Sequence, residues 1–347
     1  MSPDEVLRFH ARRALGLAPA RLLARAPLRA LLLEWLSPAE RLELALASAA
    51  TLPADERDAL AAAARALARE DDRGAEYAAA GCSNTRGLLA PHGGVEGAVI
   101  LELGTGHSLG QGALLVATGA ARYHGVDPFP VARRDAEHYR RLRALLAEEP
   151  LVAPAPGARE AALARFDAAL RPGPAGIDPD PALLALHAAD AAAIPLPDAS
   201  VTRCISKSAF EHFRDPGGAA RESLRVLVPG GVGVHVIDLR DHRSLHERPR
   251  RFLRHSAAEW ESVFEGPPNR PLSPELGRTR DPFEYTNRWR LSRYVDAFRA
   301  AGAAVEVQVQ EARPLAPGER EALDPEFRAC SAEDLEVLSV QLTVRRA

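Results

Sequence analysis

The chain has 347 residues, of which 46% are hydrophobic and only 5% are aromatic. This length exceeds that of a minimal domain and predicts a core domain with added helices. A formal net charge of −3 argues against the strongly basic surface that binds nucleic acids, so we expect no nucleic-acid partner. Three scattered cysteines fit neither a disulfide framework nor a zinc site. No apolar run reaches the ~20 residues that cross a bilayer, and we expect a cytoplasmic protein without a membrane partner.

Residues 1–97 are dense in Ala, Leu and Arg and predict a helical extension. Apolar residues at helical spacing between Leu28 and Leu36 indicate a first helix. The segment Ser37 to Glu40 has a capping serine, a proline at the first helical position and a glutamate three residues after the cap, which starts a second helix. A third is expected to follow from Pro53.

From Ala98 onward, short apolar runs alternate with glycine-containing turns and amphipathic helices. This alternation is typical of a doubly wound α/β fold, in which helices cover both faces of a mainly parallel sheet. The expected strands lie near residues 98–103, 122–127, 183–188, 201–206, 232–238, 304–310 and 335–345.

Two long insertions interrupt this alternation. About fifty residues separate the second and third strands, with a helix expected around 158–170 between two proline-rich stretches, which is too long for a routine crossover. The second insertion spans 240–290 and contains a concentration of the scarce aromatic residues. We interpret it as a lid over the substrate.

A glycine turn follows the first strand and carries most of the functional information. It reads Glu102-Leu103-Gly104-Thr105-Gly106 and leads into a helix expected to start near Leu109. In such a turn the backbone approaches a ligand closely while free amide groups face it, so nucleotide-like ligands bind there. About twenty residues later, the second strand ends in Asp127, where a carboxylate accepts hydrogen bonds from ribose hydroxyls.

The glycine spacing distinguishes between cofactors. Gly104, Gly106 and Gly110 do not follow the G-x-G-x-x-G pattern of nicotinamide enzymes. Glu102 stands just before the turn, where it could reach the amino group of a cofactor. A ligand with a positively charged portion therefore fits better than a pyrophosphate.

These segments, with Ala188–Ala191 and Leu227–Gly231, resemble the ordered motifs of class I S-adenosylmethionine-dependent methyltransferases over about residues 98–240. Residues 291–346 are similar to the final helix and antiparallel strand pair of that family. The resemblance implies a seven-stranded sheet, S-adenosylmethionine as cofactor, and methyl transfer. It also implies that the acid and glycines of the turn flank the methionyl part, that the second-strand acid holds the ribose, and that the Asp after the third strand meets the adenine amine. We assign the cofactor site to Glu102, Gly104, Thr105, Gly106, Asp127, Pro128, Asp190, Ala191 and Ser206.

The ends of the fourth and fifth strands supply candidates for proton removal. Each offers a histidine beside carboxylates, His212 and His242, and a neutral imidazole can accept the proton of an acceptor hydroxyl. We prefer His212 because the end of the fourth strand faces the cofactor in this fold. Its segment resembles the Glu-x-x-Glu-His of some quinone O-methyltransferases and small-RNA methyltransferases, where it can bind metal. Since Ser208 replaces the leading Glu, we expect no metal here.

The segment 285–290 places two arginines around an aromatic residue. Such arginines can grip a carboxylate, a phosphate or a sugar acid, although surface arginines beside a helix start are the alternative. The candidate substrate residues are Asp238, Arg240, Tyr285, Asn287 and Arg288.

We therefore predict a helical extension (1–97), a cofactor-binding core (98–239), a lid or substrate insertion (240–290) and a closing helix and strand pair (291–347). The predicted function is methyl transfer to a small-molecule acceptor, with oxygen favoured over nitrogen or carbon. Two alternatives stay open: a nicotinamide-dependent oxidoreductase, and a cofactor-binding regulatory module without turnover.

Overall fold

The computed structural model describes residues 74–346 except 107, 129–135, 149–150, 153–156, 174–175, 244–247, 267–269 and 280–284. The three helices predicted before residue 74 lie outside the described part. A helix occupies residues 74–89, and none of the helices in the described ranges is both long and apolar enough to cross a membrane. The strands are β1 (Val99–Leu103), β2 (Arg122–Asp127), β3 (Leu170–Gly173), β4 (Gly176–Pro179), β5 (Leu184–Ala188), β6 (Val201–Lys207), β7 (Leu227–Asp238), β8 (Ala303–Ala312) and β9 (Val337–Arg346).

Helices follow most of these strands and complete the layers. The α-helices are α6 (Gly110–Ala117), α7 (Ala136–Glu148), α8 (Ala158–Ala169), α9 (Pro216–Val226), α10 (Ala257–Ser262), α11 (Leu291–Ala300), α12 (Pro325–Arg328) and α13 (Ala332–Glu336). Short 3-10 turns are η2 (Ala90–His92), η3 (Phe210–His212) and η4 (Arg251–Arg254).

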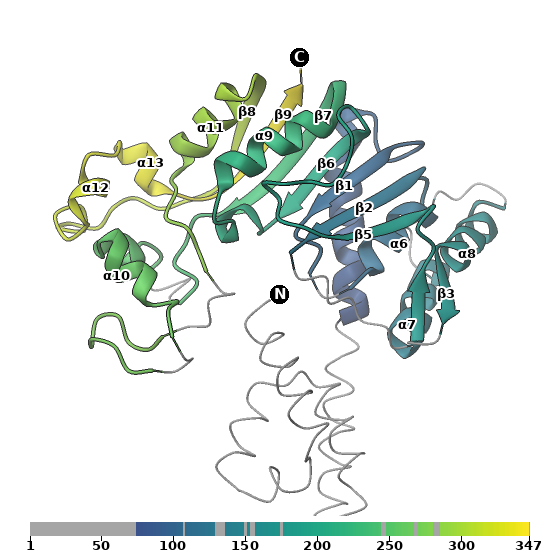
Figure 1. Ribbon diagram of the computed structural model, residues 1–347, viewed down its shortest axis with the longest axis horizontal. Helices are drawn as coiled ribbons and strands as arrows, with labels where there is room; N and C mark the ends of the chain where they lie inside the picture. The colour runs from purple at the N-terminus through teal and green to yellow at the C-terminus, as the bar shows by residue number, and fades with distance from the viewer. Residues whose placement is uncertain are drawn as a thin grey trace, which may run out of the picture.

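Seven strands form one sheet in the order β5-β2-β1-β6-β7-β9-β8 (Figure 1). β1 pairs in parallel with β2 on one side and β6 on the other, and β9 runs antiparallel to both β7 and β8. The chain order reverses between β1 and β6, and ligands bind at such a switch point, beyond the carboxyl ends of the strands. The predicted doubly wound fold with an antiparallel final strand pair is confirmed.

The two faces of the sheet have separate cores (Figure 1). α6, α7, α8 and the helix 74–89 pack on one face, and α9 and α11 pack on the other. β1 contributes to both, because successive side chains of a strand point to opposite faces: Ile100 belongs to the first core, Leu101 and Leu103 to the second. Glu102 interrupts this apolar strand.

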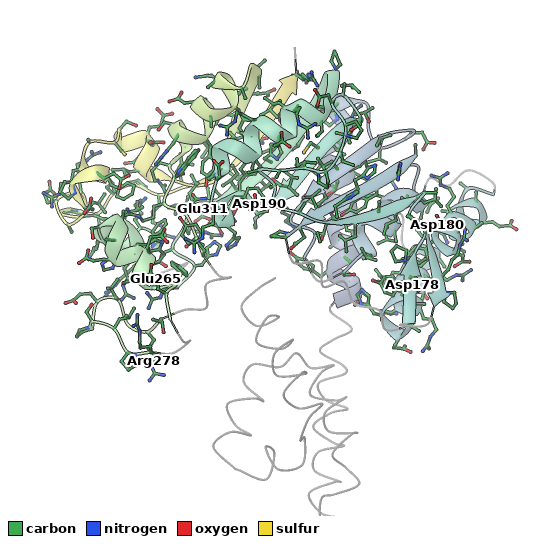
Figure 2. All side chains as sticks on the ribbon, viewed as in Figure 1. Asp178, Asp180, Asp190, Glu265, Arg278 and Glu311 are labelled. Atoms are coloured by element: carbon green, nitrogen blue, oxygen red, sulfur yellow. The ribbon has the colours of Figure 1, made fainter. Side chains whose placement is uncertain are left out.

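The first insertion contains the expected helix, α8, and two elements that the sequence did not predict. α7 precedes α8, and the proline-rich stretch after α8 forms a two-stranded antiparallel sheet of β3 and β4. Figure 2 shows Asp178 and Asp180 on this hairpin, at the far end of the sheet from α10. The hairpin therefore lies away from the switch point, whereas α7 packs beside the start of α6.

Aromatic residues of the segment 240–290 form a small core of their own. Phe252, Trp260 and Phe264 are all buried, and they pack with Leu323 and Phe327 from the connection between β8 and β9. We expected these aromatics to cover a substrate. Trp260 and Phe264 are instead structural, because burying large apolar side chains against each other is what stabilises an otherwise irregular segment.

Candidate active site

The glycine turn adopts the backbone conformation that requires glycine. Gly104 has φ 78° and Gly106 has φ 65°, in the left-handed region that other residues avoid. A Cβ at Gly104 would lie 2.7 Å from Cβ of Ala209, whereas a Cβ at Gly106 would meet no atom within 4 Å. The turn therefore touches the segment after β6 on one side and is open on the other.

Ser108 prepares the start of α6. Its Oγ accepts a hydrogen bond from the Gly110 amide at 2.9 Å and lies 2.7 Å from Nε2 of His138. This serine stands where many members of the resembling family have a third glycine. The helix N-terminus keeps its positive dipole end directed at the turn, which favours electron-rich ligand groups.

Glu102 is buried beside the turn and is already bonded within the protein. Its carboxylate accepts hydrogen bonds from the Tyr123 hydroxyl at 2.5 Å and from Nε2 of Gln111 at 2.8 Å. Burial raises the pKa of Glu102 to about 7, against the lowering effect of both hydrogen bonds. We expected this side chain to reach the amino group of a cofactor, but both oxygens have protein partners.

Two further acids stand at the same edge of the sheet. Asp127 ends β2 and is 8% exposed, next to Val126, whose carbonyl accepts from the Gly104 amide at 2.9 Å. Asp190 follows the neighbouring strand β5 and is exposed (Figure 2). Its Oδ1 accepts from the Ala192 amide at 2.8 Å, which is the turn role that a short acidic side chain often takes.

Three predicted cofactor residues act mainly through shape. Thr105 packs over Gly125 of β2, since a Cβ there would lie 2.4 Å from its methyl group. Pro128 is exposed after β2, and Ala191 is buried in the core beneath α9 and α11.

Ser206 faces the core rather than the edge. Its Oγ lies 2.9 Å from Nδ1 of His235, and both residues are buried. The ring of His235 packs against those of Phe210 and Phe298, with centroids 4.9 and 5.1 Å away. The hydroxyl of Ser206 therefore already has a partner in the protein, and cofactor titrations decide whether this residue also belongs to the cofactor site.

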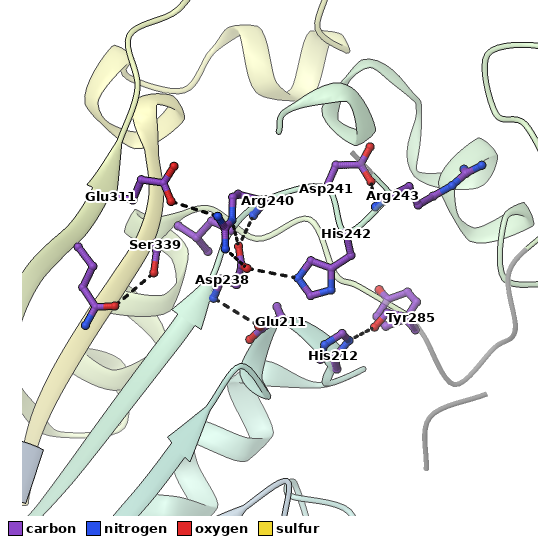
Figure 3. A network of polar contacts seen from close by, with 12 residues as sticks. Glu211, His212, Asp238, Arg240, Asp241, His242, Arg243, Tyr285, Glu311 and Ser339 are labelled. Atoms are coloured by element: carbon purple, nitrogen blue, oxygen red, sulfur yellow. Dashed lines mark hydrogen bonds and ion pairs between the residues drawn. The ribbon is translucent and has the colours of Figure 1, made fainter. Parts of the chain in front are cut away.

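His212 and His242 come together after β6 and β7 (Figure 3). Their ring centroids are 5.0 Å apart. Nδ1 of His212 lies 2.8 Å from the carbonyl oxygen of Tyr285. Because a carbonyl only accepts, Nδ1 carries the hydrogen, and the lone pair of the neutral ring is on Nε2. Nε2 of His242 is 3.8 Å from a carboxylate oxygen of Asp238.

Glu211 adds a carboxylate to this pair of histidines. Its side chain is 3% exposed, and burial raises its pKa well above the usual value. Oε1 accepts from the Asp238 amide at 3.4 Å, whereas Oε2 is buried with no hydrogen-bond partner among the described residues. One potential ligand atom from each of Glu211, His212 and His242 lies within 4.8 Å of the others.

The predicted substrate residues Asp238 and Arg240 bind each other. Nε and Nη2 of Arg240 donate to the two oxygens of Asp238 at 2.8 and 2.6 Å, and Nη1 donates to Glu311 at 3.1 Å (Figure 3). The guanidinium of Arg240 is therefore already bound to two carboxylates of the protein.

The predicted arginine grip at 285–290 is also not formed. Arg288 donates to the His255 carbonyl at 2.5 Å and to Glu326 at 3.2 Å. Arg290 is fully buried and donates to backbone carbonyls, among them that of Leu239 at 2.7 Å. Both arginines therefore have partners within the protein, and they do not lie on the surface as the alternative expected.

Asn287 ties the same segment to the turn after β6. Its Nδ2 donates to the Phe210 carbonyl at 2.8 Å, its Oδ1 accepts from the Tyr294 hydroxyl at 2.7 Å, and its amide donates to the Glu211 carbonyl at 2.7 Å. With these partners, the side chain of Asn287 links residues 285–290 to the turn after β6 and to α11.

Comparison with known proteins identifies the domain that carries these features. Residues 101–234 match the family model described as a methyltransferase domain. This match supports a methyltransferase domain in that part of the chain. A search of curated proteins found no relative.

The solved structures that resemble this methyltransferase are distant. A putative methyltransferase complexed with the Trm112 activator from Haloferax volcanii is 19% identical, with 80% of this chain and 96% of that chain covered and a TM-score of 0.36. A putative sarcosine dimethylglycine methyltransferase from Galdieria sulphuraria is 16% identical, with 82% and 88% covered and a TM-score of 0.38. An S-adenosylmethionine-dependent methyltransferase from Mesorhizobium loti is 16% identical, with 73% and 92% covered and a TM-score of 0.33. At these scores the likenesses carry no argument about the acceptor.

S-adenosylmethionine is the cofactor of this methyltransferase, and the turn fits such a ligand. The space over Gly106 is open, the backbone there is left-handed, and the start of α6 directs its dipole to the turn.

Sequence reasoning missed the polar partners that this site buries. Gln111 and Tyr123 lie 9 and 21 residues from Glu102, and the single polar residue in the otherwise apolar helix α6 was the available signal. Glu211 was noted in the sequence only as half of a broken motif. Its burial and its proximity to His242 depend on the packing of β6 against β7.

Proposed function

We propose that this methyltransferase transfers its methyl group to an oxygen of a small-molecule acceptor bound at the carboxyl ends of β6 and β7. The observation that carries the proposal is the position of His212 and His242. His212 follows β6, which is adjacent to β1 in the sheet, and His242 follows β7, the next strand along. The close approach of Gly104 and Ala209 joins the glycine turn to the His212 segment.

In this proposal the cofactor lies over the turn of Gly104, Thr105 and Gly106, with Asp127 at its ribose and Asp190 near its adenine. When bound, S-adenosylmethionine supplies a methyl group on a sulfonium, whose C–S bond breaks as the new C–O bond forms. The protein's own task is to hold the acceptor oxygen in line and to accommodate the proton that leaves it.

His212 is suited to take that proton. The Tyr285 carbonyl fixes the hydrogen on Nδ1 and would stabilise the ring after Nε2 has accepted a proton. Nε2 of His242 lies 3.8 Å from a carboxylate oxygen of Asp238. The pair therefore offers a base whose orientation is set by the main chain of residue 285.

Residues 285–290 form one wall of the acceptor side in this proposal, and the rest of 240–290 completes the cover. The hydrogen bonds of Asn287 and of the Tyr285 carbonyl to the turn after β6 support this arrangement. We also propose a cytoplasmic location, in keeping with three free cysteines.

Methyl transfer from isotopically labelled S-adenosylmethionine to a panel of phenols and alcohols tests the proposal, with the matching amines in parallel. We expect label in the hydroxyl compounds, and His212→Ala should lower the single-turnover rate by about 100-fold, the scale of a general base. The affinity for S-adenosylhomocysteine should stay close to that of the wild type. Label in the amines alone, or no turnover with any acceptor despite cofactor binding, contradicts the proposal.

A further inference from the structure

Three metal-ligating side chains meet at the acceptor edge. Glu211 and His212 come from the turn after β6, and His242 comes from the segment after β7 (Figure 3). Their potential ligand atoms all lie within 4.8 Å of one another. We propose that Glu211, His212 and His242 bind a divalent transition-metal ion, contrary to the expectation from the sequence.

The buried oxygen Oε2 of Glu211 is a second observation that points to a ligand. Buried polar atoms in folded proteins are nearly always hydrogen-bonded, and a buried carboxylate needs a compensating charge or donor. Oε2 has no hydrogen-bond partner within the part of the chain that the structure describes. A cation between this carboxylate and the two imidazoles supplies the missing charge.

His212 is already oriented as a ligand. Histidines that bind metals usually donate their second ring N–H to a carbonyl or a carboxylate, which fixes the tautomer and the ring. The bond from Nδ1 of His212 to the Tyr285 carbonyl at 2.8 Å does this and places the lone pair on Nε2. For His242, the carboxylate of Asp238 is the neighbouring group, at 3.8 Å from Nε2.

The donor set selects the kind of ion. One carboxylate oxygen and two imidazole nitrogens suit Mn²⁺, Fe²⁺, Co²⁺ or Zn²⁺, whereas Mg²⁺ and Ca²⁺ prefer oxygen alone. Ligand atoms on such an ion are about 3 to 3.5 Å apart, as bonds of roughly 2.0 to 2.2 Å require. Small rotations of the three side chains therefore bring them into coordination.

Three protein ligands leave at least one position open, as in catalytic rather than structural metal sites. The following role rests on the proposed function. An acceptor hydroxyl in the open position loses its proton to water more easily, since the cation stabilises the negative oxygen. That oxygen then uses an electron pair to form the C–O bond, the C–S pair stays on sulfur, and the oxidation state of the ion does not change. The two histidines then act as ligands, and His212 is no longer needed as the base.

Binding is tested without any acceptor, on full-length protein that carries no histidine tag and has been stripped with a chelator. Calorimetric titration with Mn²⁺ and the visible absorption spectrum with Co²⁺ should both show one ion per chain, the spectrum indicating nitrogen donors. Glu211→Gln, which keeps the shape of the side chain, and His242→Ala should each weaken binding at least about tenfold. His255→Ala is the matched control, because this half-buried histidine belongs to the same 240–290 segment but lies against Trp260.

The outcomes separate this inference from the proposed function. One ion per chain that is lost in both cluster variants and kept in His255→Ala supports the metal site, even if no hydroxyl acceptor is methylated. Binding that is absent, or unchanged by Glu211→Gln and His242→Ala in folded protein, overturns it. Turnover that is unaffected by a chelator would then leave the proposed function standing with His212 as the base.

Discussion

The two halves of the ligand edge are built in different ways. In the cofactor half, formed by the turn after β1 and the ends of β2 and β5, the recognisable features are a glycine turn and single acidic residues next to strands. In the acceptor half, formed by the turn after β6, the end of β7 and residues 285–290, side chains from three distant segments meet. Backbone features are therefore visible in a sequence pattern, whereas a side-chain cluster becomes visible only once the chain is folded.

The largest effect should come from the contact that joins the halves. Gly104→Ala puts a methyl group 2.7 Å from Cβ of Ala209 in a left-handed conformation, so we expect a loss of about 2 to 5 kcal/mol in the free energy of unfolding. Gly106→Ala is the matched variant, since its Cβ meets no atom, and only the conformational cost of about 1 to 2 kcal/mol applies. Urea unfolding measures both. Equal losses would mean that the close approach at Gly104 is relieved by movement of Ala209.

A pH effect should be specific to the cofactor half. Burial raises the pKa of Glu102 from 4.5 to about 7, so the folded protein holds this proton more tightly than the unfolded chain. The contribution of Glu102 to the free energy of unfolding is complete below the pKa that this group has in the unfolded chain. It is lost, about 3 kcal/mol in all, as pH rises through the pKa in the folded protein. The difference in unfolding free energy between wild type and Glu102→Gln should shift by that amount between about pH 4 and pH 8.

Tyr123→Phe tests the same carboxyl by raising its pKa further, whereas Glu102→Gln removes its titration. It removes the hydroxyl that donates to the Glu102 carboxylate, so the pKa of Glu102 should rise further and the loss of stability should extend to higher pH. Unfolding curves that give wild type and Glu102→Gln the same pH dependence would show that this carboxyl does not titrate in that range.

The smallest effects distinguish two residues that sequence reasoning treated alike. Asp127→Ala should weaken S-adenosylhomocysteine binding by about 1.5 to 3 kcal/mol, because hydrogen bonds to a charged group are lost. Ser206→Ala should leave that affinity unchanged and lower the unfolding free energy by about 1 kcal/mol, through its bond to His235. Calorimetry and unfolding of both variants measure this contrast. A reduced affinity in Ser206→Ala would assign that residue to the cofactor site.

Most of the fold was predictable because it depends on local patterns. Each of the seven predicted strands is present within a few residues of its expected bounds, except that β7 starts at Leu227 rather than near 232. β7 shows a register shift against β6 between Val201 and Arg203. The hydrophobic periodicity of the sequence does not predict such a shift.

The hydrogen-bond partners of the candidate substrate residues were not predictable, because those partners lie far along the chain. Arg240 bonds to Glu311, 71 residues away, and Arg288 bonds to Glu326, 38 residues away. A motif shows that an arginine is present but not whether its charge is already matched. Glu211 and His242 are also far apart in the sequence, so their cluster could not be predicted from a local motif.

The hydrogen bonds of Asn287 have a consequence for how an acceptor enters. They lock residues 285–290 to the turn that bears His212, so these two pieces must move as one body. An acceptor therefore cannot enter through a movement of residues 285–290 alone, since that movement would also displace the imidazole of His212. Changes at Asn287 should therefore alter the position of the His212 imidazole together with that of residues 285–290.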